Sequence, residues 1–195
     1  MTERATDRIE ELIRSAESLA SKSWFDRAGI ARTRRAMDRL HPEDLEPDSV
    51  GRFSPGRGWS SQCVCSHSRF DIGLFFVPAG QVIPLHDHPF MTVFQRILWG
   101  PFEIRAFDWD QRFPWSGLAR STYEITAGGD AGTLLILPAY GNLHTLKALE
   151  DGLFLDCVMP PYDESDGRVC HYYGQVGTVA TTDGTLTRLE VVDGP

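Results

Sequence analysis

The residues of this sequence best suited to do chemistry are two histidines, His86 and His88, in an apolar stretch with a proline on either side. Because alternate residues of a β-strand point to the same face, a strand here would project both imidazoles together, about 7 Å apart, and turn Asp87 the other way. Neutral imidazole is a common ligand for iron, zinc, copper and nickel. The pair indicates part of a metal site, although two ordinary hydrogen-bonded histidines explain the pattern equally well.

Two glycines flank this pair. Gly80 lies six residues before His86, and Gly100 lies twelve residues after His88. With them, the stretch resembles the first sequence motif of the cupins, which are small double-stranded β-barrels with a metal inside. That motif usually carries a Glu five residues after the second histidine, where this chain has Val93, a residue that cannot bind a metal.

Residues 132–144 resemble the second cupin motif, and the resemblance implies that His144 is the third ligand. Three neutral ligands leave a divalent metal with its full positive charge, which an anionic thiolate can partner in place of the missing carboxylate. A six-coordinate metal would also have room for an amine and for O2, the arrangement of thiol dioxygenases. Zinc with one bound water uses the same three ligands, so ligand identity alone does not decide the metal.

Asp156 lies alone in an apolar run, twelve residues after His144. Because an unpaired buried charge is costly, this carboxylate needs a partner. It could accept the free N–H of a ligand histidine or contact a substrate amine. A structural ion pair or a position at the barrel rim is the alternative.

Farther along the chain, Tyr162 is followed by Cys170 and Tyr172. A tyrosine near a metal can hydrogen-bond a bound oxygen species or control access, although an ordinary aromatic with a surface hydroxyl is the commoner case. Cys170 and Tyr172 would share one face of a strand. A Cys–Tyr thioether occurs in some thiol dioxygenases, and these two residues are the candidates for it here.

The elements that must position these residues follow from hydrophobic periodicity. Apolar residues at spacings of three and four predict an amphipathic helix over 6–22 and a second helix over about 30–40. Residues 42–55 are polar and interrupted by Pro and Gly, which indicates a connection. The expected strands cover 70–77, 82–85, 91–99, 102–109, 121–125, 133–137, 143–148, 152–159, 178–181 and 185–192. Many short strands with Gly and Pro turns predict a barrel or sandwich.

Length and composition limit the function classes. A chain of 195 residues with 42% hydrophobic residues can bury one domain's core. The net charge of −8 argues against nucleic-acid and anionic-membrane partners. The sequence has no long apolar run, and its charged N-terminus lacks the core of a signal peptide, so we expect a cytoplasmic protein. Of the four cysteines, Cys63 and Cys65 have a faint metal-site spacing, but small hydrophobes on one strand face explain them better.

Taken together, the ordered segments resemble the plant cysteine oxidase and cysteamine (2-aminoethanethiol) dioxygenase family over about residues 9–175. The segments that carry the resemblance are 86–89, 91–94, 104–109, 141–144, 155–156, 160–162 and 170–173, together with the helical lead-in that ends in 41–45. The resemblance implies a mainly β cupin fold, a double-stranded β-helix or jelly-roll barrel over 51–195, with a helical lead-in over 1–50 packed on it as one domain. It implies Fe(2+) bound by His86, His88 and His144, with Asp156, Tyr162, Cys170 and Tyr172 in supporting catalytic roles.

The implied reaction is the O2-dependent oxidation of a thiol to a sulfinic acid. The substrate would be cysteamine or another small thiol, or the N-terminal cysteine of a peptide, and no residue separates these; we expect a monomer. Phe90 replaces the Gly that commonly follows the histidine pair and its Pro, and is expected to narrow the pocket mouth; Tyr140 replaces a small residue. The alternatives are a Zn- or Mn-dependent hydrolase or isomerase, and a non-catalytic barrel that binds a small molecule or senses a gas.

Overall fold

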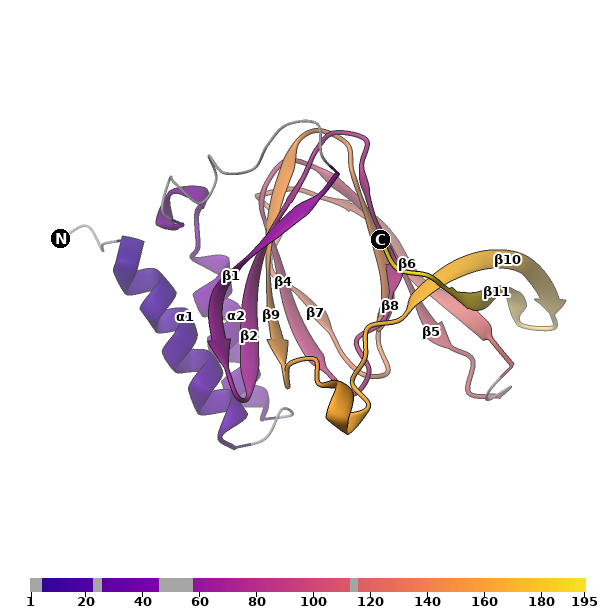
Figure 1. Cartoon of the computed structure of the whole chain (residues 1–195), viewed down its shortest axis with the longest axis horizontal. Helices are drawn as coiled ribbons and strands as arrows, with labels where there is room; N and C mark the ends of the chain where they lie inside the picture. Colours follow the sequence, from indigo (N-terminus) through magenta and orange to yellow (C-terminus); the bar gives the residue numbers. More distant parts are fainter. Residues whose placement is uncertain (1–4, 23–25, 46–57, 113–115) are drawn as a thin grey trace.

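The computed structural model describes residues 5–22, 26–45, 58–112 and 116–195, in which two α-helices precede a series of β-strands (Figure 1). The elements are α1 (Ala5–Ala20), α2 (Arg27–Asp38), η1 (Pro42–Asp44), β1 (Ser60–His67), β2 (Phe70–Val77), β3 (Val82–His86), β4 (Thr92–Trp99), β5 (Phe102–Trp109), β6 (Leu118–Ala127), β7 (Leu134–Ile136), β8 (Leu143–Ala148), β9 (Gly152–Met159), η2 (Glu164–Asp166), β10 (Tyr172–Thr181) and β11 (Gly184–Val192).

The strands form two antiparallel sheets. Sheet A has the order β1-β2-β9-β4-β7, and sheet B is the closed ring β10-β11-β6-β5-β8-β3. The two strand sets β2-β9-β4-β7 and β3-β8-β5-β6 have the strand order of an eight-stranded jelly roll. The long β10–β11 hairpin extends away from the barrel (Figure 1). The mainly β, cupin-type fold is therefore confirmed.

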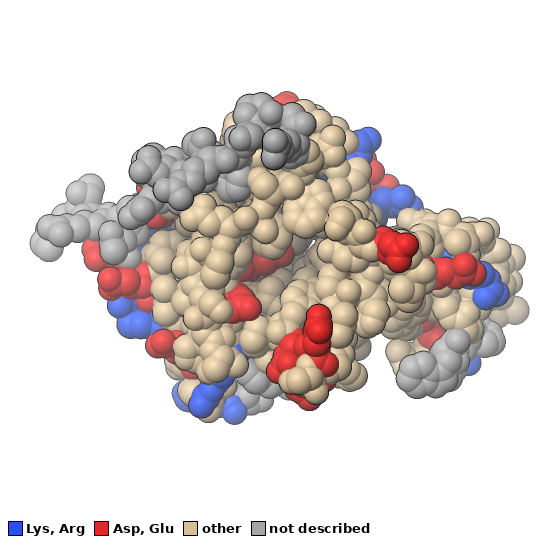
Figure 2. All heavy atoms as spheres, in the orientation of Figure 1, with Lys and Arg blue, Asp and Glu red and all other residues tan. Residues whose placement is uncertain are grey.

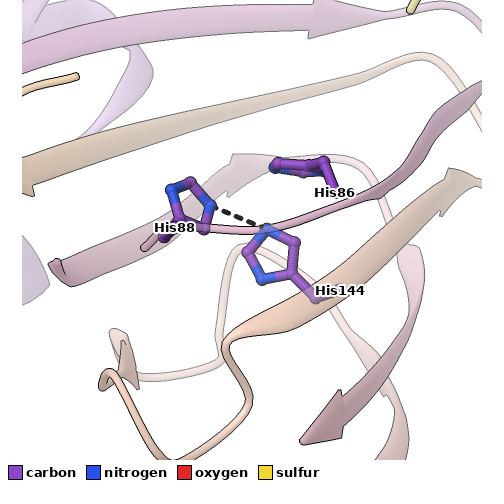
Figure 3. A group of neighbouring side chains, drawn as sticks. All are labelled: His86, His88 and His144. Atoms are coloured by element: carbon purple, nitrogen blue, oxygen red, sulfur yellow. Dashed lines mark hydrogen bonds between the residues drawn. The ribbon is translucent and has the colours of Figure 1, made fainter. Parts of the chain in front are cut away.

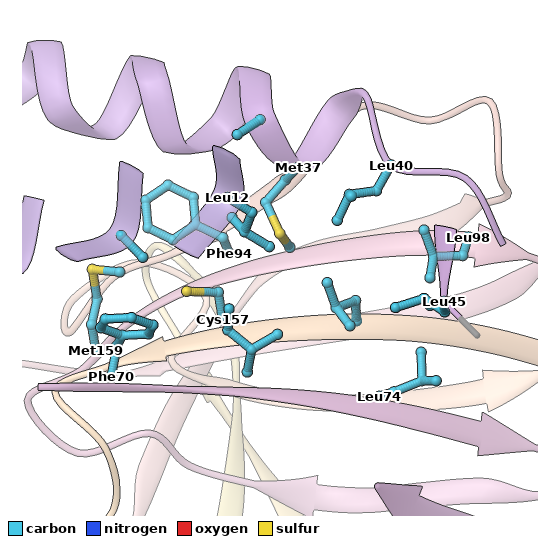
Figure 4. Close-up of a cluster of buried hydrophobic side chains, with 14 of the residues drawn as sticks. Leu12, Met37, Leu40, Leu45, Phe70, Leu74, Phe94, Leu98, Cys157 and Met159 are labelled. Atoms are coloured by element: carbon cyan, nitrogen blue, oxygen red, sulfur yellow. The ribbon is translucent and has the colours of Figure 1, made fainter. Parts of the chain in front are cut away.

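The two helices cover the outer face of sheet A. Asp26 caps α2 by accepting hydrogen bonds from the backbone N–H groups of Ala28 and Gly29. Buried residues of both helices, such as Leu12 and Met37, share one apolar cluster with strand residues (Figure 4). Both helices match the predicted ones to within three residues. The proposed boundary between residues 50 and 51 lies outside the described residues, as does the connection from residue 46 to 55.

A second apolar cluster lies between the two sheets, toward one end of the barrel. Sheet A contributes residues such as Ile97 and Phe154, and sheet B contributes residues such as Ile104 and Leu146. The Phe75 and Phe154 rings stack 4.8 Å apart within it. This cluster forms an apolar floor beneath the polar residues described below.

Some strands differ from the predicted ones. Strand β10 begins at Tyr172 rather than at residue 178, because β11 pairs with it along nearly its whole length. In β1, a register shift falls between Cys63 and Cys65. The expected shared face is therefore wrong: Cys63 is exposed, and only Cys65 packs against the helix-side cluster. In the described part of the chain, no helix combines the length and apolarity that crossing a membrane requires.

Candidate metal centre

Three histidines converge inside the barrel (Figure 3). His86 is the last residue of β3, and His144 on β8 is its register partner. His88 lies just beyond the end of β3, before the turn at residues 89–90, and its imidazole projects to the same side as that of His86. The ligand atoms of the three side chains lie within 4.8 Å of one another, and the Nε2 atoms of His88 and His144 are 3.3 Å apart. All three residues are at least nine-tenths buried.

The hydrogen bonds of two rings identify the nitrogen that is free to bind a metal. His86 Nδ1 lies 2.8 Å from the carbonyl of Pro84, which can only accept, so Nδ1 carries the proton and Nε2 the lone pair. The Tyr162 hydroxyl donates to the Asp87 carbonyl at 2.8 Å and therefore accepts from His88 Nδ1 at 2.7 Å. Both Nε2 lone pairs face the centre of the group. This is the outer support that metal-binding histidines usually have.

The electrostatics of the group also fit a metal. Burial lowers the pKa of all three imidazoles, and the neighbouring histidines lower the pKa values of His88 and His144 further. The rings are therefore neutral at neutral pH, as metal ligation requires. Val93, at the usual position of a ligand Glu, is buried in an apolar cluster with Met91 and Ile136. The donor set is three neutral nitrogens, which suits iron, zinc, copper or nickel.

The loop that carries His88 is fixed by a residue the sequence analysis did not single out. Asn142 accepts from the His88 backbone N–H at 3.3 Å and donates to the His88 carbonyl at 2.7 Å. Asp108 accepts from the backbone N–H groups of Gly141 and Asn142 and holds this turn. Since Asn142 lies two residues before His144, these contacts fix two of the three histidines relative to each other.

Asp87, the residue between the two histidines, anchors the segment that closes the barrel. Its carboxylate accepts from the backbone N–H of His171 at 2.8 Å and from the Tyr173 hydroxyl at 2.8 Å. As expected, the Asp87 side chain points away from the centre of the three histidines, toward His171 and Tyr173. Tyr172, between these two residues, pairs with His86 and joins β10 to β3.

The predicted catalytic residues Tyr162, Cys170 and Tyr172 lie beside the histidines. The Cys170 thiol lies beside the hydroxyls of Tyr162 and Tyr172, and burial raises its pKa. Burial raises the pKa of Tyr172 to about 12. The rings of Tyr172 and His86 lie 6.1 Å apart, centre to centre. Cys170 lies two residues before Tyr172, the first residue of β10, so the predicted strand does not reach it, but the two side chains are in contact.

Asp156 lies on β9 and is 5% exposed. Its neighbours Leu155 and Cys157 belong to the helix-side cluster, so Asp156 points into the barrel. None of the three ligand histidines bonds it; two have other partners, and Nδ1 of His144 has none among the described residues. Its Oδ1 has no hydrogen-bond partner there either. Burial raises the pKa of Asp156 to about 7, and the nearby Gln95 amide partly opposes this.

Gln95 on β4 is a polar residue that the sequence analysis missed. It is the register partner of Asp156 and is fully buried. Its amide lies near enough to Asp156 to lower the pKa of that carboxyl by hydrogen bonding, although neither amide atom has a partner at ordinary hydrogen-bond distance among the described residues. The signal in the sequence was weak, because Gln95 is followed directly by the charged Arg96 and so does not stand alone in an apolar run.

Comparisons with known proteins identify a family and several relatives. The PCO_ADO family matches residues 40–191. Plant cysteine oxidase 2 of Arabidopsis thaliana is 35% identical over 155 residues, covering 74% of this chain and 56% of that protein. The 2-aminoethanethiol dioxygenase of Homo sapiens is 35% identical over 130 residues, covering 53% of this chain and 47% of that protein. The chain thus spans about half the length of the curated relatives it matches.

Solved structures with a similar fold share less sequence. An RmlC-like cupin protein from Desulfovibrio desulfuricans is 23% identical with a TM-score of 0.41, over 53% of this chain and 84% of that one. KdgF from Halomonas sp. is 16% identical with a TM-score of 0.43, over 58% of this chain and 88% of that one.

Proposed function

The chain belongs to the PCO_ADO family, and we propose that it is an Fe(2+)- and O2-dependent thiol dioxygenase that oxidises an aminothiol to its sulfinic acid. The observation that carries the proposal is the buried group of three neutral imidazoles without a carboxylate. Relatives named for cysteine and for 2-aminoethanethiol support the reaction and the substrate class. The overall change adds both atoms of O2 to one sulfur, RSH + O2 → RSO2H, and needs no further reductant.

His86, His88 and His144 would hold the iron, which supplies the redox-active centre where a thiolate and O2 meet. The protein's own part is to keep the imidazoles neutral by burial and to orient two of them through Pro84 and Tyr162. Because no ligand carries negative charge, the anionic sulfur of the substrate is the natural partner for the metal's charge. This preference favours thiols over neutral substrates.

The opposite wall of the barrel supplies the second half of substrate recognition. We place the substrate amino group at Asp156, whose buried Oδ1 has no hydrogen-bond partner in the described structure. The surface charge fits a substrate that carries an amine. The face in Figure 2 is hollowed between the two sheets, and acidic side chains gather over η2, which contains the exposed residues Glu164 and Asp166. Negative charge near a site attracts cations from solution.

Tyr162 and Cys170 complete the proposed site. The Tyr162 hydroxyl accepts a hydrogen bond from His88 and lies beside the Cys170 thiol. It therefore lies between one proposed metal ligand and the one thiol of the proposed site. Burial raises the pKa of Tyr162 well above the usual range, which keeps its hydroxyl protonated and able to donate. Whether Cys170 and Tyr172 join in a thioether can be read directly from the intact mass, since that bond removes two hydrogens.

The proposal extends to the setting of the protein. The described cysteines are all free, as a reducing compartment such as the cytoplasm would keep them. We also expect the chain to act as a monomer, a prediction that sedimentation can check.

The test is oxygen consumption by protein loaded anaerobically with Fe(2+), against cysteamine, cysteine, 3-mercaptopropionate and a short peptide that begins with Cys. Uptake of O2 matched by a product heavier by about 32 Da would support dioxygenation. Metal analysis of the same samples separates the alternatives. Activity that needs zinc or manganese and no O2 would indicate a hydrolase or isomerase, and fully iron-loaded protein without thiol-dependent uptake would indicate a sensor.

A further inference from the structure

The residues that follow β11 lie against a residue of the proposed site. Strand β11 ends at Val192, which is the register partner of Tyr172, the first residue of β10. Two residues later, the backbone of Gly194 packs against the Tyr172 ring, since a Cβ atom added to Gly194 would lie 2.8 Å from the ring carbons Cδ2 and Cε2. A real Cβ atom does not come this close to another carbon, so only glycine permits the approach.

Tyr172 also contacts the metal centre. Its backbone pairs with His86, and the rings of these two residues lie 6.1 Å apart, centre to centre. Its hydroxyl lies beside the Cys170 thiol. The orientation of the Tyr172 ring therefore decides whether this hydroxyl stays at the thiol, and Gly194 contributes to that orientation from outside the histidine group.

The contacts continue from Tyr172 to a proposed metal ligand. The Cys170 thiol lies beside the hydroxyls of both Tyr172 and Tyr162. The Tyr162 hydroxyl in turn accepts from His88 Nδ1 at 2.7 Å. If the Tyr172 ring moved away, the thiol would lose one of these two hydroxyl neighbours and would become more accessible to solvent. Packed groups in continuous contact can transmit such a displacement to the ligand.

We propose that Gly194 is a positioning residue of the site. It holds the Tyr172 ring against Cys170, and so keeps this thiol shielded and the Tyr162 hydroxyl in place at His88. Gly194 acts only through Tyr172 and contacts neither substrate nor metal. The effect on turnover rests on the proposed function, whereas the shielding of the thiol can be measured without iron.

The shielding of Cys170 has a chemical reason. A site that brings thiols and O2 together also exposes its own thiol to oxidation and to exchange with disulfides. Thiolate is the reactive form, and burial raises the pKa of Cys170 and so keeps the thiol protonated. A ring fixed by Gly194 maintains that burial.

The test replaces Gly194 by valine, whose side chain forces either the Tyr172 ring or the backbone of residue 194 to move. In the metal-free protein, we expect iodoacetamide to alkylate Cys170 about fivefold faster or more, as measured by mass spectrometry of the peptide that contains it. In the Fe(2+)-loaded protein, kcat for cysteamine should fall about three- to tenfold while KM stays within about twofold. KM is spared because Asp156, the proposed partner of the substrate amine, lies on the other sheet.

A second background isolates the contact with the ring. In Tyr172→Ala, which has no ring to displace, alkylation of Cys170 should already be fast, and Gly194→Val should not change it further. Equal accelerations by Gly194→Val with and without the ring would overturn the proposal. Gly194→Ala adds only the Cβ atom and should give the same changes at smaller size, so it decides the question if the valine variant does not fold.

Gly177→Val is the matched control, because Gly177 lies on β10 and a Cβ atom added there meets no other group within 4 Å. It should leave both the alkylation rate and kcat at their wild-type values. If it changed them as much as Gly194→Val does, the hairpin as a whole would hold Tyr172, and the role of Gly194 would be refuted.

The result also stays separate from the proposed function. If the wild-type protein oxidised no thiol, the proposed function would fail, but the alkylation rates would still decide whether Gly194 holds the ring. If the wild type were active and Gly194→Val kept its kcat and its alkylation rate, only the role of Gly194 would fail. Faster alkylation with unchanged kcat would overturn the positioning role, because the contact would then shield the thiol without supporting the reaction.

Discussion

The two walls of the barrel treat their polar groups differently. On sheet B and its loops, His86, His88 and Asn142 have protein partners that fix their orientation. On sheet A, Asp156 and Gln95 are as deeply buried, but three of their polar atoms have no hydrogen-bond partner within the described ranges. Of the three histidines, only His144 leaves its outer nitrogen without a partner in the described structure, and under the proposed function the free atoms of sheet A meet the substrate.

This difference follows from what each wall holds. Metal ligands must stay within a few tenths of an ångström of their positions, so the outer nitrogens of His86 and His88 bond to the Pro84 carbonyl and to the Tyr162 hydroxyl. Groups that bind a substrate must keep their hydrogen-bonding atoms free in its absence. Buried atoms without hydrogen bonds lower the free energy of unfolding. The contrast yields predictions for each wall, ordered below from the largest expected effect to the smallest.

The largest effect on metal content and activity should come from removing one of the three histidines. His144→Ala leaves two histidines, which cannot hold iron, so metal content and activity should both be lost. Metal analysis after anaerobic loading measures this. His171→Ala, which removes a half-exposed histidine outside the triad, should still load iron; a fully loaded His144→Ala variant would refute the three-histidine assignment.

On the substrate wall, Asp156→Asn should retain iron and lose about 100-fold or more in kcat/KM, because a buried charged partner of the substrate amine is removed. Steady-state kinetics with matched metal content measure the loss. Asp71→Asn, on the neighbouring strand and bonded to Ser66, is the control and should behave like the wild type. Unchanged turnover in Asp156→Asn would return Asp156 to a structural role.

The same substitution predicts a pH dependence of stability in the metal-free protein. The pKa of Asp156 is raised to about 7 by burial, so the folded state holds this proton more tightly than the unfolded state. Stability should therefore fall as pH rises from about 4 to about 7, by at most roughly 4 kcal/mol from this group. Asp156→Asn should unfold at higher denaturant than the wild type at pH 8 and equally at pH 4; equal stability at both would contradict the assignment.

A smaller effect is expected from the outer support of the metal wall. Tyr162→Phe removes the hydroxyl that accepts from His88 Nδ1, so metal affinity should fall about 10- to 100-fold while the fold is kept. Competition with a chelator measures the affinity. Tyr140→Phe removes an exposed hydroxyl and should leave it unchanged. If both variants bound metal equally well, Tyr162 would not support the ligand.

The smallest effect on activity should come from the residue next to Asp156. Cys157 faces the helices in the apolar cluster, so Cys157→Ser buries a hydroxyl and should cost about 1–3 kcal/mol of stability. The activity of the folded protein should not change. Denaturation and kinetics on the same sample test this, and a lost activity would mean that the two faces of β9 are not independent.

Much of this arrangement was visible in the sequence. Periodicities of 3.6 and 2 located both helices and most strands, because each element buries one face. The spacing of His86 and His88, together with the later His144, predicted the three-histidine site on sheet B and its loop, since histidines in this pattern are typical of metal sites. The neighbours of His88 were less predictable, because the contacts of Tyr162 and Asn142 depend on how separate loops meet.

The substrate wall was the least predictable part. Gln95 and Asp156 are 61 residues apart in the sequence and meet only through strand register, which periodicity does not determine. The bulge that separates Cys63 from Cys65 was hidden for the same reason, since a single inserted residue changes the face without changing the composition. A lone polar residue in an apolar run identified Asp156, whereas Gln95 gave no such signal because the charged Arg96 follows it.

The most direct test of the account is the reaction of the Fe(2+)-loaded protein with cysteamine and with a short peptide that begins with Cys, under isotopically labelled O2. The account predicts a sulfinic acid that carries both labelled atoms, about 36 Da heavier than the thiol. A product with one labelled atom or none, or a disulfide as the only product, would contradict thiol dioxygenation by this site.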